Sequence, residues 1–261
     1  MLKAVLFVLL SAFILIPVSA QDTPVSTLEF RANGEDFVRQ GFVSKDGWSI
    51  QFDHVFVALS RIRAYQTNPP YDPFSGELTR SAVMVGLPGQ VVIDLAEGGE
   101  TAALLLIGTV EDAPMGYYNA ISFEMSPALE GDHAGNTLVI DGTAAREGQS
   151  VDFVIRVDES SSYDCGAYIG DERKGILQEG APGEVELTFH FDHLFGDAGT
   201  PLEDSLNTLA PGFDMFAALA VDGVLDVTLS DLEAGLSAEN YQMVTQILPT
   251  LGHTGEGHCH E

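Results

Sequence analysis

Short segments of alternating apolar and polar residues, separated by clusters of Gly, Pro, Asn and Asp, run through most of the sequence. This pattern is the strongest constraint on the fold, because such segments are typical of strands and the separators favour turns. Alternation is clearest in VDFVIRV at 151–157 and VELTFHF at 185–191. The sequence therefore predicts an all-β fold, an antiparallel β-sandwich. Its expected strands cover residues 26–32, 50–65, 82–86, 91–95, 102–110, 117–125, 138–144, 150–157, 184–191 and 223–230.

Helical periodicity is rare in the same sequence. The best candidate spans residues 238–248, where Tyr241, Val244 and Ile247 are spaced for one apolar face and Pro249 stops the helix. A shorter turn or helix is expected within 202–209. The loop 66–77 is too Pro-rich for regular structure, and residues 159–183 form a long connector that contains Cys165. We therefore expect three parts: a signal peptide at 1–20, a β-sandwich at 21–232, and a C-terminal helix with a His-rich tail at 233–261.

The first 20 residues, MLKAVLFVLLSAFILIPVSA, have the layout of a secretory signal peptide: one Lys, an apolar run and small residues at the end. Cleavage removes Lys3 and no acid, so the formal charge of −28 becomes −29. So acidic a chain is not expected to bind nucleic acid. The mature sequence has no apolar stretch long enough for a membrane helix. We expect a soluble protein of the periplasm or the extracellular space.

Two cysteines, Cys165 and Cys259, would lie in an oxidising compartment after export. A single disulfide is the simplest use of an even pair there. Cys259 also lies between His258 and His260, so a metal thiolate competes with the bridge as an interpretation. Export favours the bridge.

Histidines are the most informative residues for function. Three of the seven, His253, His258 and His260, fall in the last nine residues. Imidazole is the commonest ligand of transition metals, and an extended His258-x-His260 would place both rings on one side. His253 can fold back toward them across two glycines. The alternative interpretation is a disordered polar tail with incidental metal affinity.

A second cluster lies in FHFDHLFGD, which contains His190 and His193. On a continuous strand these two side chains would point to opposite faces, so they converge only if the strand ends near Asp192. The following Gly196 suggests that it does. His54 shares its strand face with two phenylalanines, which is typical of a histidine packed in the core, although metal ligation remains a second interpretation.

Catalytic motifs are missing from the sequence. It contains no G-x-S-x-G elbow, no H-E-x-x-H helix, no P-loop and no dinucleotide-binding glycine motif. We therefore expect a protein that is not an enzyme.

Three stretches carry a resemblance to a known family. FVALSRIRAY at 56–65 and APMGYYNAISF at 113–123, together with FHFD at 189–192, resemble segments of the MbnP-like family of exported β-sandwich proteins associated with copper handling. The resemblance implies binding rather than turnover, with copper held by histidines and, in some members, an oxidised Trp beside them. The only Trp here is Trp48, which the sequence alone indicates is an aromatic residue at a strand entrance.

These observations give two hypotheses for function. The first is an exported, non-catalytic binder of copper or zinc, whose candidate ligands are His54, His190, His193, His253, His258 and His260. The second is an interaction module of the cell envelope that binds another envelope protein or a glycan and needs no metal, because β-sandwiches serve many such roles. Cys259 as a ligand would favour Zn(II) or Cu(I), whereas an all-imidazole set admits Cu(II) or Zn(II).

Overall fold

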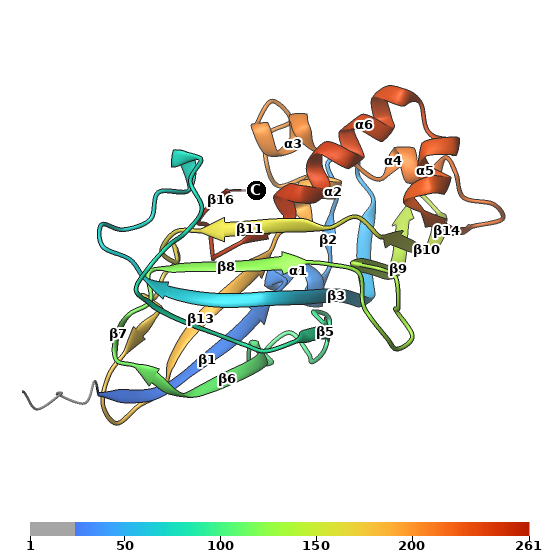
Figure 1. Ribbon diagram of the computed structural model, residues 1–261. Coiled ribbons are helices and arrows are strands. Elements are labelled where there is room, and N and C mark those ends of the chain that lie inside the picture. Colours follow the sequence, from blue (N-terminus) through green and yellow to red (C-terminus); the bar gives the residue numbers. More distant parts are fainter. Residues whose placement is uncertain (1–23, 261) are drawn as a thin grey trace, which may run out of the picture.

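The computed structural model describes residues 24–260, and most of its regular structure is β-strand (Figure 1). The predicted strands are confirmed in position, several with shifted ends. Short strands at Phe42–Val43, in the connector 159–183 and in the tail were not predicted. The strands are β1 Val25–Asn33, β2 Phe42–Val43, β3 Ser49–Gln66, β4 Val83–Gly86, β5 Gln90–Asp94, β6 Leu105–Pro114, β7 Gly116–Tyr117, β8 Ala120–Met125, β9 Leu138–Arg146, β10 Gln149–Val157, β11 Ser161–Cys165, β12 Ile176–Leu177, β13 Gly183–Phe189, β14 Val224–Thr228, β15 Gly252–His253 and β16 Cys259–His260.

Within residues 24–260, the longest helix is the predicted one. It spans Ala238–Ile247, begins with the Ser237 hydroxyl accepting a hydrogen bond from the Asn240 N–H, and passes into a 3-10 turn that contains Pro249. A helix also lies within 202–209, as expected. The helices are α1 Glu35–Gln40, α2 Asp192–Phe195, α3 Ser205–Leu209, α4 Asp214–Ala217, α5 Leu229–Gly235 and α6 Ala238–Ile247, with 3-10 turns η1 Pro73–Ser75 and η2 Leu248–Leu251.

The larger sheet is built around β3, which is 18 residues long and pairs with five other strands. Its main path runs β14-β10-β9-β3-β8-β11-β16 and curls into a half-barrel. Residues of β10 alternate between buried and exposed positions, as the sequence predicted. One face of this sheet therefore supplies the core.

Of the two main sheets, the smaller has the order β15-β13-β1-β6, and β7 and β12 form a separate two-stranded sheet. The central pair of the smaller main sheet, β1 and β13, is parallel, and so is the pair β10 and β14 in the larger sheet. The sheets are thus mixed, and the expectation of antiparallel pairing throughout is wrong at these two pairs. Side-chain alternation is the same in both pairing modes, so the pattern could not distinguish them.

A single hydrophobic core joins the two sheets and the helices. Phe189, Phe191 and Phe195 are fully buried in it, and their rings contact aromatic side chains from β3, β8 and β10. The core therefore holds the end of β13 and the following turn in a fixed position.

The C-terminal segment is ordered and belongs to both sheets. β15 pairs with β13 in the smaller sheet, whereas β16 pairs with β11 in the larger one. The disulfide Cys165–Cys259 joins β11 to β16, which confirms the predicted bridge. The interpretation of a disordered tail is therefore wrong, because strand pairing and a covalent bond both hold it.

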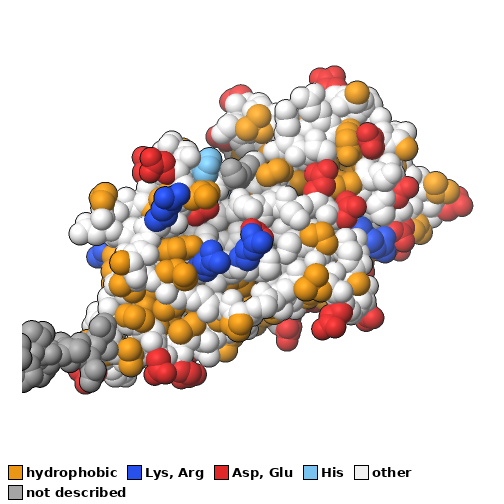
Figure 2. Space-filling view, viewed as in Figure 1, with side chains coloured by type: hydrophobic (Ala, Val, Ile, Leu, Met, Phe, Trp, Pro, Cys, Tyr) orange, Lys and Arg blue, Asp and Glu red, His pale blue; other side chains and the backbone are white. Residues whose placement is uncertain are grey.

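The surface and the N-terminus bear on the expected location. Acidic side chains are spread over the face shown in Figure 2, with a few basic groups gathered near its centre. A disulfide favours an extracytoplasmic compartment. The predicted signal peptide lies outside the described residues. Across residues 24–260, no helix combines the length and apolarity needed to cross a membrane.

Candidate metal centre

The centre begins where β13 ends. The strand stops at Phe189, and α2 forms one helical turn that ends as the Gly196 N–H donates to the Asp192 carbonyl. Its apolar residues Leu194 and Phe195 are buried in the core, and its polar residues Asp192 and His193 are buried and half-buried. The expectation that the strand ends near Asp192 is confirmed, and this ending lets His190 and His193 converge.

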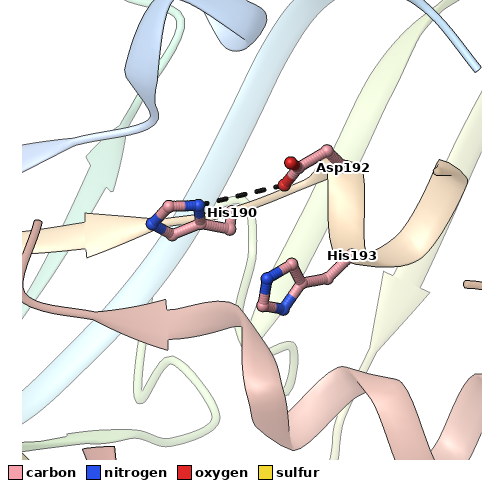
Figure 3. A group of neighbouring side chains, drawn as sticks. All are labelled: His190, Asp192 and His193. Carbon is pink, nitrogen blue, oxygen red and sulfur yellow. Dashed lines mark ion pairs between the residues drawn. The ribbon is translucent and has the colours of Figure 1, made fainter. Parts of the chain in front are cut away.

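Three side chains from this turn bring donor atoms together (Figure 3). One ligand atom each from His190, Asp192 and His193 lies within 4.8 Å of the others. His190 Nδ1 is 3.9 Å from an Asp192 carboxylate oxygen. Two imidazoles and a carboxylate at this spacing are a donor set that first-row transition metals accept.

The carbonyl of Thr250 orients two imidazoles. It lies 3.0 Å from His193 Nδ1 and 3.0 Å from His253 Nε2. A carbonyl only accepts hydrogen bonds, so both of these nitrogens donate. His193 Nε2 and His253 Nδ1 therefore carry lone pairs, and metal-binding histidines are commonly held by such backbone contacts.

His190 is oriented in the same manner by a different carbonyl. Its Nε2 lies 3.2 Å from the carbonyl oxygen of Gly255, and its Nδ1 faces the carboxylate of Glu35 at 3.4 Å. The Gly255 N–H donates to the Thr188 hydroxyl, which fixes that carbonyl in turn. The nitrogen directed at Asp192 and Glu35 is thus the one available to a metal.

Burial changes the protonation of the surrounding groups. It lowers the pKa of His193 to about 4 and that of His253 to about 3, and the neighbouring His190 lowers both further. Burial also raises the pKa of Asp192, and raises that of Glu35 to about 7 against the opposing effect of His190. His193 and His253 are therefore neutral at pH 7, the form that binds metal.

Two buried atoms in this cluster lack a hydrogen-bond partner within residues 24–260: Asp192 Oδ1 and His253 Nδ1. Leaving a buried polar atom unsatisfied is costly, and such atoms are uncommon in native proteins. Both atoms are acceptors here, so a bound cation would satisfy both.

The structure brings together four of the six predicted ligands. Ring centroids of His190 and His253 are 4.4 Å apart, those of His193 and His253 are 5.1 Å apart, and those of His253 and His258 are 5.5 Å apart. His190 and His253 are buried, whereas His258 is exposed at the edge of a cavity of about 310 Å³. His260 pairs with Asp164 across β16 and β11 and does not line that cavity.

His54 lies elsewhere, on β3, with no contact to this cluster among the described residues. Its side chain is 52% exposed, so the expectation of a core histidine is wrong. Its Nδ1 is 2.7 Å from the Asp94 carboxylate, and its ring stacks on Phe56, which also stacks on His133. The local bulge between Phe52 and His54 moves this side chain off the buried face.

Sequence reasoning missed two residues of the centre. Asp192 stands between the two histidines in H-x-D-H, a spacing that could have indicated it. Glu35 begins α1, far away in sequence, with a φ of 57°, and no local signal points to it.

Two other residues singled out in the sequence have different surroundings. Cys259 is bonded to Cys165, so the thiolate interpretation is wrong. Trp48 is buried against Phe213 and donates its indole N–H to Asp214. It therefore serves packing at the start of β3.

Comparison of the chain with models of protein families, with curated proteins and with solved structures found no match. The geometry of this centre is therefore the main indication of what the protein does.

Proposed function

We propose that this protein is an exported, non-catalytic binder of a divalent transition metal ion. His190 Nδ1, an Asp192 carboxylate oxygen and His193 Nε2 hold the ion, and His253 Nδ1 supplies the fourth donor. The observation that carries the proposal is the convergence of three donor atoms within 4.8 Å, next to two buried acceptors without partners. The resemblance to copper-associated exported proteins points in the same direction.

The donor set limits the metal. Three imidazoles and one carboxylate suit Cu(II) and Zn(II), and the disulfide removes the thiolate that Cu(I) would favour. The Irving–Williams order gives Cu(II) the higher affinity at a given site. We therefore expect binding of both ions, with Cu(II) tighter than Zn(II).

Calorimetric titration of chelator-stripped protein tests this proposal. We expect one ion per chain with a Kd below ~10 μM. His193→Ala and His190→Ala should weaken binding at least tenfold, since each removes a ligand. His54→Ala is the matched control, because this histidine is exposed and outside the cluster.

The single variants are preferable to deletion of residues 252–261, because that deletion would also remove β15, β16 and the disulfide. Absence of binding by the intact protein would contradict the proposal and leave the envelope interaction module as the better hypothesis. Equal weakening by His54→Ala would place the metal elsewhere.

A further inference from the structure

We propose that His258 is the loading ligand of this centre: it captures the metal ion at the mouth of the cavity and passes it inward to His253 and His193. This inference rests on the proposed function and adds a route and a residue for metal exchange. His258 binds the ion transiently as it enters or leaves and is not a ligand of the ion in the filled centre.

The cavity provides the route. It lies between α3, the end of α6, η2 and the two tail strands, where the C-terminal segment runs beneath α3 and α6 in Figure 1. Leu206, Leu209 and Ile247 give it apolar walls, and three histidines supply its nitrogen atoms: His193, His253 and His258. The other polar groups of the lining are oxygens of Ser205 and Thr250, and a transition-metal ion prefers the three imidazoles to these.

Burial increases from the ring at the mouth to the rings behind it. His258 is exposed, His193 is half-buried, and His253 and His190 are 5% and 6% exposed. The rings of His258 and His253 are 5.5 Å apart, so one ion about 2 Å from a nitrogen of each can be shared between them. The unpartnered Nδ1 of His253 is the acceptor available to receive the ion.

His258 is held at this position by its neighbours. Cys259 follows it directly and is bonded to β11, while Thr254 and Gly257 form a tight backbone pairing before it. Phe74, from the loop that precedes β4, contacts the imidazole edge-on with centroids 6.0 Å apart. The ring therefore stays at the mouth although it is exposed.

A histidine at the mouth can lower the main energy barrier to metal entry into a buried site, which is the loss of hydration water. A hydrated cation must lose water before it reaches the inner ligands, and desolvation without replacement ligands is costly. An imidazole that replaces water at the mouth lowers this barrier for entering and leaving ions alike. Its loss should slow both processes and leave the equilibrium affinity unchanged.

Stopped-flow mixing of the oxidised, full-length protein with aqueous Cu(II) tests the proposal, followed by release into excess EDTA. In His258→Ala and His258→Gln we expect association and release each to slow by about tenfold, with Kd changed less than twofold. His260→Ala is the matched control, because it has the same residue type on the other side of Cys259 and lies outside the cavity. Its rates should equal those of the wild type.

Leu209→Trp gives an independent variant, since Leu209 lines the cavity and is exposed. It should slow both rates by narrowing the mouth, whereas Leu202→Trp, exposed but outside the cavity, should not. Unchanged rates in both His258 variants would overturn the proposal. A larger Kd with an unchanged association rate would also overturn it, because that result would make His258 a ligand of the bound ion. Absence of Cu(II) binding by the wild-type protein would instead overturn the proposed function.

Discussion

At the residue scale, the buried titratable groups of the centre have opposite effects on the stability of the fold as pH changes. The lowered pKa values of His193 and His253 mean that the unfolded chain takes up protons below pH 6.5 while the folded, metal-free protein does not. Stability therefore falls as pH decreases from 6.5 toward 4. Glu35 acts in the opposite direction, because its raised pKa lets the folded state keep a proton up to about pH 7. The contribution of Glu35 to the free energy of unfolding therefore falls as pH rises from 4.5 to 7.

Glu35→Gln separates these contributions. Glutamine does not titrate, so the unfolding free energy of the variant relative to the wild type should be ~1–2 kcal/mol higher at pH 8 than at pH 4.5. This figure is reduced because the Glu35 side chain is 23% exposed to solvent. Urea unfolding of the metal-free proteins at both pH values measures this difference. Asp36→Asn controls for the general loss of an acidic group. An equal gain at both pH values would show that Glu35 is not protonated in the folded state.

Local sequence could predict part of the centre. His190 and His193 were found because Gly196 signals the end of the strand, and His253 because glycines follow it. Glu35 was missed because it follows β1, whereas His190 follows β13. The two residues meet only because these distant strands pair, and such pairing leaves no local pattern in the sequence. His54 was misjudged because the bulge beside it reverses the expected face.

At the element scale, α2 shows how context changes the meaning of a motif. Phe52-Asp53-His54 and Phe191-Asp192-His193 share three residue types in order. The first lies within the first third of β3, whereas the second enters a helical turn whose end at Gly196 brings the side chains together. The turn, rather than the motif, makes the donor set.

Gly196→Ala tests the turn. Gly196 has a φ of 69° and a ψ of 175°, a conformation almost confined to glycine, and an added Cβ would lie 2.6 Å from Asn207 Oδ1. We expect a loss of ~2–4 kcal/mol in unfolding free energy and weaker Cu(II) binding. Gly76→Ala, at a φ of 72° with open space around it, should cost only ~1–2 kcal/mol. Similar losses in both variants would mean that the packing around Gly196 relaxes.

The length of a strand determines whether the sequence can predict it. Long alternating segments such as β3 and β10 were located because one face is buried along their length. β15 and β16 have two residues each and depend on partners about 65 to 95 positions earlier in the chain, as the pairings with β13 and β11 show. Two residues carry too little periodicity to indicate a strand.

At the scale of the whole molecule, the disulfide closes a large part of the chain into one loop. Cys165 and Cys259 are 94 positions apart, and β16 has only two paired residues to hold it without the bond. The bridge therefore determines whether the tail, and with it His258, stays near the cavity.

Cys165→Ser with Cys259→Ser should lower the unfolding free energy by ~2–4 kcal/mol, because the open chain has more conformational freedom when unfolded. Thermal unfolding of the metal-free protein measures the loss. Reduction of the wild-type protein with dithiothreitol should give the same shift, and the reduced double variant serves as the control for the reductant itself. A double variant as stable as the oxidised wild type would contradict the expectation.

The tail also couples the two sheets, since β15 and β16 are only five residues apart and belong to different sheets. In hydrogen-exchange experiments, regions joined in this way open as one cooperative unit. We therefore expect the amides of β13 and β11 to share one opening event while the bridge is intact. Once the bridge is reduced, the two sheets should open separately, and we expect the amides of β11 to exchange before those of β13.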